Sequence, residues 1–183
     1  CNRALWEALE QGRVDKDFLK VERFRRLFAA HAIDADPVCA GQVYLEWLPQ
    51  TVVLVDGARA ACEVLAAHGE IGIITNGIEQ VQSRRIAVSG LGDLIRFVAT
   101  SEACGHAKPD VRFFAYATAM ASAFEPHRTI IIGDRLEADI LGANRYGIDS
   151  CWFNPGGSPR HGEAIPTCEI SRLDALPAVL GLA

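Results

Sequence analysis

The 183-residue sequence lacks an apolar run long enough to cross a bilayer, and it has no excess of basic residues. Its formal net charge is −5 and its isoelectric point is near 5.5. This balance argues against nucleic acid or an anionic membrane as the main partner. Basic residues gather around Lys20, Arg23, Arg25 and Arg26, where apolar residues alternate with them. We interpret this group as the solvated face of a helix.

The sequence also lacks closely spaced cysteines. Six cysteines occur without a C-x-x-C spacing and without a histidine at metal-ligand spacing: Cys1, Cys39, Cys62, Cys104, Cys151 and Cys168. We therefore expect reduced, mostly buried cysteines in a cytoplasmic protein. Because the first residue is not methionine, we expect further residues upstream and make no prediction about a signal peptide.

Half of the residues are apolar, which is enough for a sizeable core and favours one domain with a small appendage. The first fifty residues show helical spacing without a strand. One helix is predicted at residues 2–10, a second after Asp15, and a third with Asp36 as its N-cap and Pro37 in its first turn. The sequence thus predicts a small helical unit, residues 1–50, before a larger domain, residues 51–183.

After Pro49 the pattern alternates between helix and strand. Strands are predicted at residues 71–74, 97–100, 129–132, 150–153 and 168–170. Helices are predicted at residues 57–68, 78–89, 109–120, up to about 146, and from 173, with residues 101–107 as a loop and Pro109 opening its helix. Repeated βα units of this length predict an α/β fold with a doubly wound, Rossmann-like parallel sheet.

An acidic turn follows one of the predicted strands. Residues 130–139 read I-I-I-G-D-R-L-E-A-D, so Asp134 lies at the carboxyl end of a buried strand, where open α/β sheets bind ligands. Asp139 is about a turn and a half further on and returns to the same crevice. Two carboxylates at a strand end suit Mg²⁺. Taken alone, the motif favours Asp134 as a helix cap and Asp139 in solvent, and it is the rest of the chain that favours a metal site.

Two other polar residues, Thr75 and Lys108, also lie next to predicted strands or helices where a ligand could bind. Thr75 ends a predicted strand, and Thr75-Asn76-Gly77 opens a helix whose first N–H groups could bind an anion. Lys108 lies in the loop before another helix. A hydroxyl, backbone N–H groups, a cation and a metal site are what phosphoryl transfer requires. Singly, these residues fit an N-cap, a turn glycine and an exposed lysine; together, in this order, they favour phosphoryl chemistry.

This order of motifs resembles the haloacid dehalogenase-like hydrolase superfamily, in I-I-T-N-G at residues 73–77, A-K-P-D at 107–110 and G-D-R-L-E-A-D at 133–139. The segments at 139–148 and 151–155 look most like the pyrimidine 5′-nucleotidase subgroup, and the early residues look like part of its helical cap. The resemblance implies that Thr75 binds the transferring phosphoryl group, Lys108 neutralises it, and Asn76 and Gly77 position the substrate.

The resemblance also implies that Asp134 coordinates Mg²⁺, while Asp139 supports the metal site and holds Lys108. The implied activity is Mg²⁺-dependent hydrolysis of a small phosphorylated substrate, a pyrimidine nucleoside monophosphate, through an aspartyl-phosphate. Arg135 stands where relatives often carry a small hydroxyl residue, which leaves the substrate preference open.

The family's nucleophile and acid–base residue lie in a D-x-D motif at the end of the first strand, and this sequence has no such strand-end motif. Asp56 follows the helical region and lacks the second carboxylate, so we predict that it caps a helix. The missing strand would be central in the sheet, between those that end at Thr75 and Asp134. We therefore expect the nucleophile upstream, and we expect the 183 residues alone neither to fold stably nor to hydrolyse phosphate esters.

Three other functions compete with a phosphatase. A haloacid-type dehalogenase uses the same ester chemistry without metal, but it has no need of Asp134 and Asp139. A phospho-acceptor signalling domain places its aspartate before the threonine and lysine, the reverse of the order here. The third is a truncated, non-catalytic nucleotide-binding protein. Trp6, Trp47, Tyr44 and Phe18 could stack on a base, but their helical spacing is more typical of a core.

Overall fold

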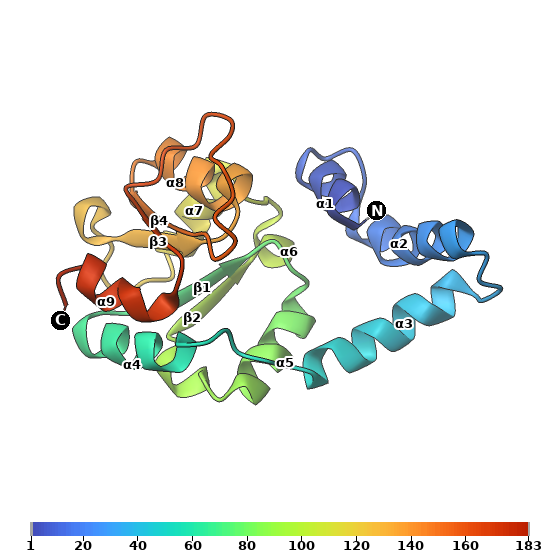
Figure 1. Cartoon of the computed structure of the whole chain (residues 1–183), viewed down its shortest axis with the longest axis horizontal. Helices are drawn as coiled ribbons and strands as arrows, with labels where there is room; N and C mark the ends of the chain where they lie inside the picture. The colour runs from blue at the N-terminus through green and yellow to red at the C-terminus, as the bar shows by residue number, and fades with distance from the viewer. Residues whose placement is uncertain (1, 183) are drawn as a thin grey trace. The chain divides into compact units, whose positions relative to one another are not determined.

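The computed structural model describes residues 2–182 and consists of two compact units, Cys1–Val52 and Val53–Ala183. The first unit is helical and the second mixes helices with strands (Figure 1). The first contains α1 (Asn2–Glu10), α2 (Lys16–His31), α3 (Pro37–Trp47) and the short 3-10 helix η1 (Leu48–Gln50).

The helices of the first unit begin where the sequence predicts. The Asp15 carboxylate caps α2 by accepting a hydrogen bond from the Phe18 N–H at 2.7 Å. Asp36 caps α3 in the same way through the Val38 N–H at 2.9 Å. A side-chain acceptor at this position satisfies an N–H group that the helix itself leaves open.

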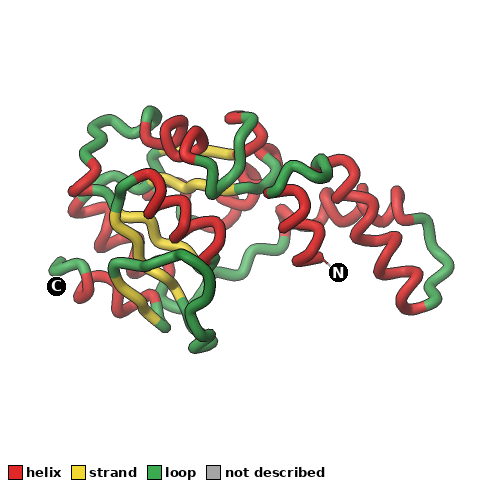
Figure 2. The backbone as a smooth tube through the Cα atoms, turned by 90° about the horizontal axis from the view of Figure 1, so that it is seen from above, coloured by secondary structure: helices red, strands yellow, loops and turns green. Residues whose placement is uncertain are grey.

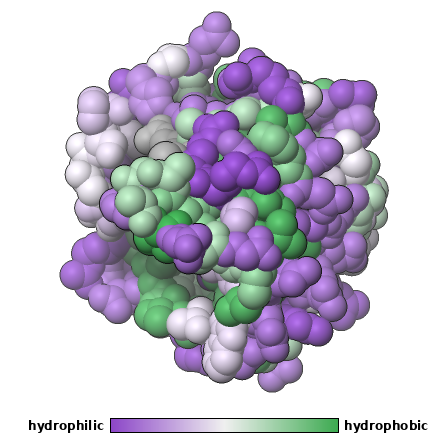
Figure 3. Space-filling view, turned by 90° about the vertical axis from the view of Figure 1, so that its right-hand side faces the viewer, coloured by the Kyte–Doolittle hydropathy of each residue, from purple (hydrophilic) through white to green (hydrophobic). Residues whose placement is uncertain are grey.

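The apolar face of the first unit is incompletely buried. The rings of Phe24 and Tyr44 meet edge to face at 5.6 Å and join α2 to α3. However, Trp47 is 59% exposed and Phe18 is 43% exposed. Apolar residues, in green, reach the surface in the view of Figure 3. The core position that helical spacing favours for Trp47 and Phe18 is therefore not observed.

The second unit has short strands and helices in alternation. Its strands are β1 (Gly72–Thr75), β2 (Phe97–Thr100), β3 (Ile130–Gly133), β4 (Asp149–Phe153) and β5 (Cys168–Ile170). Its α-helices are α4 (Ala58–His68), α5 (Glu79–Ser89), α6 (Ser101–Cys104), α7 (Val111–Thr118), α8 (Leu141–Tyr146) and α9 (Leu176–Val179). Its other helical turns are η2 (Gly92–Leu94), η3 (Pro126–Arg128), the π-helix η4 (Leu136–Ile140) and η5 (Leu173–Ala175).

All paired strands are parallel, as predicted, and they form two sheets with the orders β1-β2 and β3-β4-β5. Helices α7 and α8 cover one face and helices α4 and α9 the other, so the strands lie between two helical layers (Figures 1 and 2). The cluster under α7 and α8 includes Ile74 of β1 and Ile131 of β3, so one core serves both sheets. This arrangement confirms the α/β, Rossmann-like fold class.

Three local predictions were wrong. Residues 101–104 form α6 because the Thr100 hydroxyl caps a helical turn within the predicted loop. Helix α7 begins at Val111 rather than at Pro109, because the Asp110 carboxylate accepts from the Arg112 N–H at 2.9 Å and so fixes the start. Asp56 does not cap α4, since Gly57, with φ of 79°, occupies the N-cap position without a side-chain bond.

The cysteines differ from expectation in their burial. Those in the described part of the chain are free, but Cys151 alone among them is buried, Cys39 is exposed, and three are half-buried: Cys62, Cys104 and Cys168. Burial raises the pKa of the Cys151 thiol to about 12, and the neighbouring Cys168 adds to the effect. Separately, none of the helices within residues 2–182 is long and apolar enough to cross a membrane.

Candidate functional site

Thr75 ends β1 with its hydroxyl already oriented. The Thr75 Oγ1 accepts a hydrogen bond from the Gly77 N–H at 3.0 Å, which turns the chain sharply after the strand. Because the hydroxyl oxygen acts as acceptor there, its own hydrogen remains to be donated to a ligand. The end of β1 therefore presents an O–H donor at the carboxyl edge of the sheet.

Lys108 lies beside Thr75 and is held at both ends. Its main chain pairs with the side chain of Asn76, whose Oδ1 accepts from the Lys108 N–H at 2.8 Å and whose Nδ2 donates to the Lys108 carbonyl at 3.1 Å. Its ammonium group donates to the Ile74 carbonyl at 2.9 Å and to Asp139 at 2.6 Å. The side chain is 10% exposed, so this is a nearly buried cation.

Asp139 lies in the turn that follows β3 and pairs with Lys108. Its Oδ1 binds the Lys108 ammonium, and its Oδ2 accepts from the Arg135 N–H at 3.1 Å. The close approach of Asp139 to the end of β3 depends on Gly133, because a Cβ atom there would lie 2.4 Å from the carboxyl group. The structure thus brings together Thr75, Lys108 and Asp139, which are widely separated in the sequence.

Asp134 lies at the end of β3 and is exposed. Its carbonyl accepts a hydrogen bond from the indole N–H of the buried Trp152 at 3.1 Å, which fixes the main chain of the turn. The carboxylate itself has no hydrogen bond or ion pair with the described residues. Asp134 does not cap the following turn, because Arg135 occupies the N-cap position without a side-chain bond.

Two groups near the site were missed in the sequence. The carboxylate of Glu102, on α6, accepts from the Glu79 N–H at 2.9 Å, so the first N–H group of α5 is already satisfied. His161, in the loop after β4, binds Glu137 of η4 at 2.7 Å. Partial burial of Glu137 raises the pKa of its carboxyl, but the bond to His161, a backbone hydrogen bond and the charge of Arg135 together lower it below its usual value. The spacing of residues in the sequence predicts neither contact.

The sheet is open where these groups meet. Within the described ranges, β1 pairs with β2 alone and β3 with β4 alone, so each has one unpaired edge. The Ile71 carbonyl accepts from the Arg96 N–H on the β2 side at 2.8 Å. Since alternate residues of a strand face opposite neighbours, the Ile74 carbonyl points to the open edge, where it meets Lys108.

Neither D-x-D triplet of the sequence lies at a strand end. The triplet at residues 15–17 begins α2 and that at residues 34–36 precedes α3, where Asp15 and Asp36 serve as helix caps. Across the part of the chain that the structure describes, no group of three or more His, Cys, Asp or Glu side chains is arranged to hold a metal ion.

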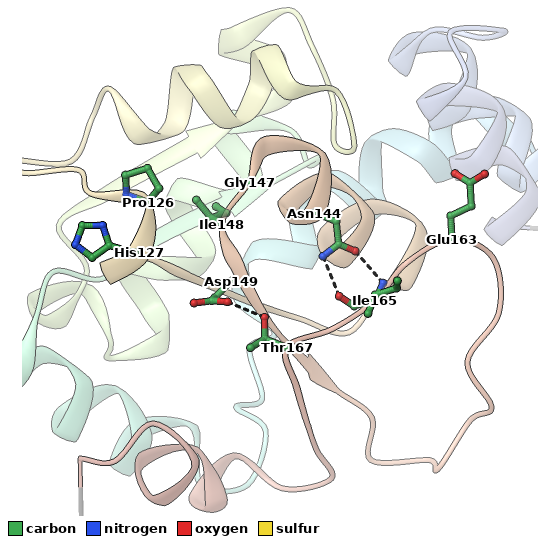
Figure 4. Close-up of a pocket in the computed structure, with 9 residues that line it drawn as sticks. All are labelled: Pro126, His127, Asn144, Gly147, Ile148, Asp149, Glu163, Ile165 and Thr167. Atoms are coloured by element: carbon green, nitrogen blue, oxygen red, sulfur yellow. Dashed lines mark hydrogen bonds between the residues drawn. The ribbon is translucent and has the colours of Figure 1, made fainter.

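A pocket lies elsewhere, at the amino ends of β3 and β4 (Figure 4). Its walls include His127, Asp149 and Glu163, and two of its residues, Asn144 and Ile165, bind each other. The carboxyl ends of these strands lie at the opposite edge of the sheet, where Asp134 follows β3. The pocket is therefore separate from the candidate site.

Comparison with known proteins identifies the family of the chain. The family model described as haloacid dehalogenase-like hydrolase matches residues 22–153. The HAD-hydrolase YfnB of Bacillus subtilis is 35% identical over 181 residues, which span 99% of this chain and 77% of YfnB. A crystal structure of YfnB bound to magnesium has a TM-score of 0.90 and covers 98% of this chain and 78% of that one.

Two further relatives are named for an activity. The pyrimidine 5′-nucleotidase PynA of Streptococcus pneumoniae is 35% identical over 170 residues, covering 92% of this chain and 72% of PynA. The pyrimidine 5′-nucleotidase YjjG of Escherichia coli is 28% identical over 179 residues, covering 98% of this chain and 79% of YjjG. The family predicted from the three motifs is confirmed, and the chain belongs to the haloacid dehalogenase-like hydrolases.

Proposed function

We propose that the protein hydrolyses phosphomonoesters and that pyrimidine nucleoside 5′-monophosphates are its substrates. The observation that carries this proposal is the nearly buried Lys108 ammonium beside Thr75, at a sheet edge that also presents Asp134. The names of PynA and YjjG support the choice of substrate.

The donors at this edge suit a phosphoryl group. An ammonium group has three hydrogens, and Ile74 and Asp139 take two of those on Lys108. Among the described residues this leaves one N–H for a phosphoryl oxygen, next to the O–H of Thr75. In a site with little water, such fixed donors stabilise the charge that develops during phosphoryl transfer.

We propose that a magnesium ion binds at this edge of the sheet, with Asp134 as its ligand among the described residues. The exposed Asp134 carboxylate, with no partner in residues 2–182, is a suitable oxygen ligand, whereas both oxygens of Asp139 bind other groups. We assign Asp134 as a ligand and Asp139 as the residue that supports the site through Lys108 and the Arg135 N–H. When bound, Mg²⁺ would neutralise charge on the phosphoryl oxygens.

We further propose that an aspartate outside residues 1–183 is the nucleophile, on a parallel strand that occupies the open edge between β1 and β3. Its carboxylate oxygen would bond to phosphorus while the ester oxygen leaves with its electron pair and takes a proton from the acid–base aspartate of the same D-x-D motif. Water would then attack the aspartyl-phosphate and release inorganic phosphate. We also propose that the helical unit, residues 1–50, is part of a cap domain.

The test is phosphate release by the full-length protein from uridine, cytidine and adenosine 5′-monophosphates, with Mg²⁺ or with EDTA. We expect Mg²⁺-dependent release, faster for the pyrimidines. A parallel assay offers 2-chloropropionate and measures chloride in EDTA. Chloride release, or no phosphate from any ester, would overturn the proposal in favour of the dehalogenase or the non-catalytic binding protein.

A further inference from the structure

Asn76 connects the strand that ends at Thr75 with the loop that carries Lys108. Both functional groups of its amide are used on one residue, with Oδ1 to the Lys108 N–H at 2.8 Å and Nδ2 to the Lys108 carbonyl at 3.1 Å. This two-point contact resembles the pairing of adjacent strands, because it satisfies a donor and an acceptor of the same residue.

The contact also sets where the lysine side chain runs. Asn76 follows Thr75 and binds the main chain of Lys108. Ile74 precedes Thr75, and its carbonyl accepts a hydrogen bond from the Lys108 ammonium at 2.9 Å. Lys108 is thus attached on both sides of Thr75. The two residues that flank Thr75 therefore hold both the main chain and the ammonium group of Lys108.

We propose that Asn76 is a positioning residue that holds the Lys108 ammonium in register with the Thr75 hydroxyl, so that both donors meet one phosphoryl group. The inference rests on the proposed function, and it assigns Asn76 a partner in the protein rather than in the substrate. The aspartate Asp139 fixes the charged end of Lys108, and Asn76 fixes its main chain.

The chain offers a matched control. Asn144 makes the same two-point contact with Ile165, accepting from its N–H at 2.8 Å and donating to its carbonyl at 2.9 Å, at the separate pocket (Figure 4). Asn144→Ala removes two hydrogen bonds of the same kind without touching Lys108. Asn76→Asp keeps the acceptor for the Lys108 N–H and removes the donor to its carbonyl.

The experiment is competitive acetylation of the full-length protein with acetic anhydride, read by peptide mass spectrometry as the rate at Lys108 relative to Lys20. Lys20 is a partly exposed reference, with a side chain 27% exposed. We expect Asn76→Ala, which removes both hydrogen bonds to Lys108, to raise this ratio about fivefold or more, and Asn76→Asp, which removes one of them, to raise it less. Asn144→Ala leaves the ratio unchanged, whereas general loss of stability would raise labelling at both lysines.

Phosphate release is measured on the same variants. We expect kcat in Asn76→Ala to fall by about tenfold or more with little change in KM, because small errors in position are costly in the transition state. An unchanged acetylation ratio in Asn76→Ala, or an equal rise in Asn144→Ala, would overturn the inference. If the wild type releases no phosphate while the ratio rises as expected, the proposed function fails and the positioning contact stands.

Discussion

At the scale of single residues, the Lys108 ammonium is a charge with little access to water. Its side chain is 10% exposed and that of its partner Asp139 is 8% exposed, with 2.6 Å between Nζ and Oδ1. A buried ion pair contributes little net stability, but removal of one partner leaves the other charge buried and uncompensated. Asp139 is therefore expected to matter for folding as well as for activity.

The variant Asp139→Ala tests this expectation. We expect the free energy of unfolding of the full-length protein to fall by about 3–5 kcal/mol, measured by urea denaturation. The control is Asp17→Ala, which removes a carboxylate bound to Lys20 at 2.8 Å on a side chain that is 89% exposed. The control should cost much less than Asp139→Ala, and equal losses in the two variants would contradict the account.

At the scale of elements, the turn after β3 shows how local structure places a side chain. In η4 the Ile140 N–H and the Asp139 N–H both donate to the Arg135 carbonyl, at 3.3 and 2.8 Å. The wider π-type turn carries Asp139 back over Gly133, where its carboxylate reaches Lys108. Such turns often occur at functional sites because one extra residue redirects a side chain.

Helix α7, which follows Lys108, has an N-cap that depends on pH. The side chain of Arg112, with its N–H, holds the pKa of Asp110 at about 2, below the ordinary 3.8. Because the folded pKa is lowered, the contribution of Asp110 to stability is present above the unfolded value and is lost as the pH falls through about 2.

The variant Asp110→Asn retains a cap acceptor but loses the charge. We expect wild type to be more stable than this variant at about pH 5, with the difference shrinking as the pH falls from about 4 to about 2. Thermal melts of both proteins across this range measure the difference. A difference that stays constant down to about pH 2 would show that the charge of Asp110 does not act as described.

The secondary-structure elements were predictable where the apolar pattern was strong. The predicted boundaries were wrong where a helix cap determines them. Strands β2 and β5 have the predicted bounds, β1 and β3 are shifted by one residue at both ends, and β4 begins one residue earlier than predicted. The predicted start of α7 was wrong because the prediction placed Pro109 in the first turn, whereas the Asp110 side chain caps the helix one residue later. The short helix α6 was missed because a single turn leaves no periodicity to detect.

At the scale of the whole molecule, the candidate site joins two sheets. Thr75 and Lys108 belong to the β1-β2 side, Asp134 and Asp139 to the β3 side, and the ion pair between Lys108 and Asp139 links them. The two sheets also share the core beneath α7 and α8. The open edges of β1 and β3 lie where we propose that a further strand completes the sheet.

The site was predicted unevenly. Strand-end positions in the sequence indicate Thr75 and Asp134, since the carboxyl ends of parallel strands meet at one edge. The roles of Lys108 and Asp139 came from the resemblance to a family. The contacts of Asn76 with Lys108 and of Trp152 with Asp134 join residues 32 and 18 positions apart, and no spacing rule predicts such pairs.

The most direct test of the account is the Mg²⁺ dependence of phosphate release from uridine 5′-monophosphate by the full-length wild type and by Asp134→Asn. Asp149→Asn is the control, since Asp149 is exposed at the opposite edge of the sheet and binds Thr167. We predict that Asp134→Asn raises the Mg²⁺ concentration for half-maximal activity by about tenfold or more, while the control matches wild type. Equal Mg²⁺ dependence in wild type and Asp134→Asn, or full activity in EDTA, would contradict a phosphoryl-transfer site built around Asp134.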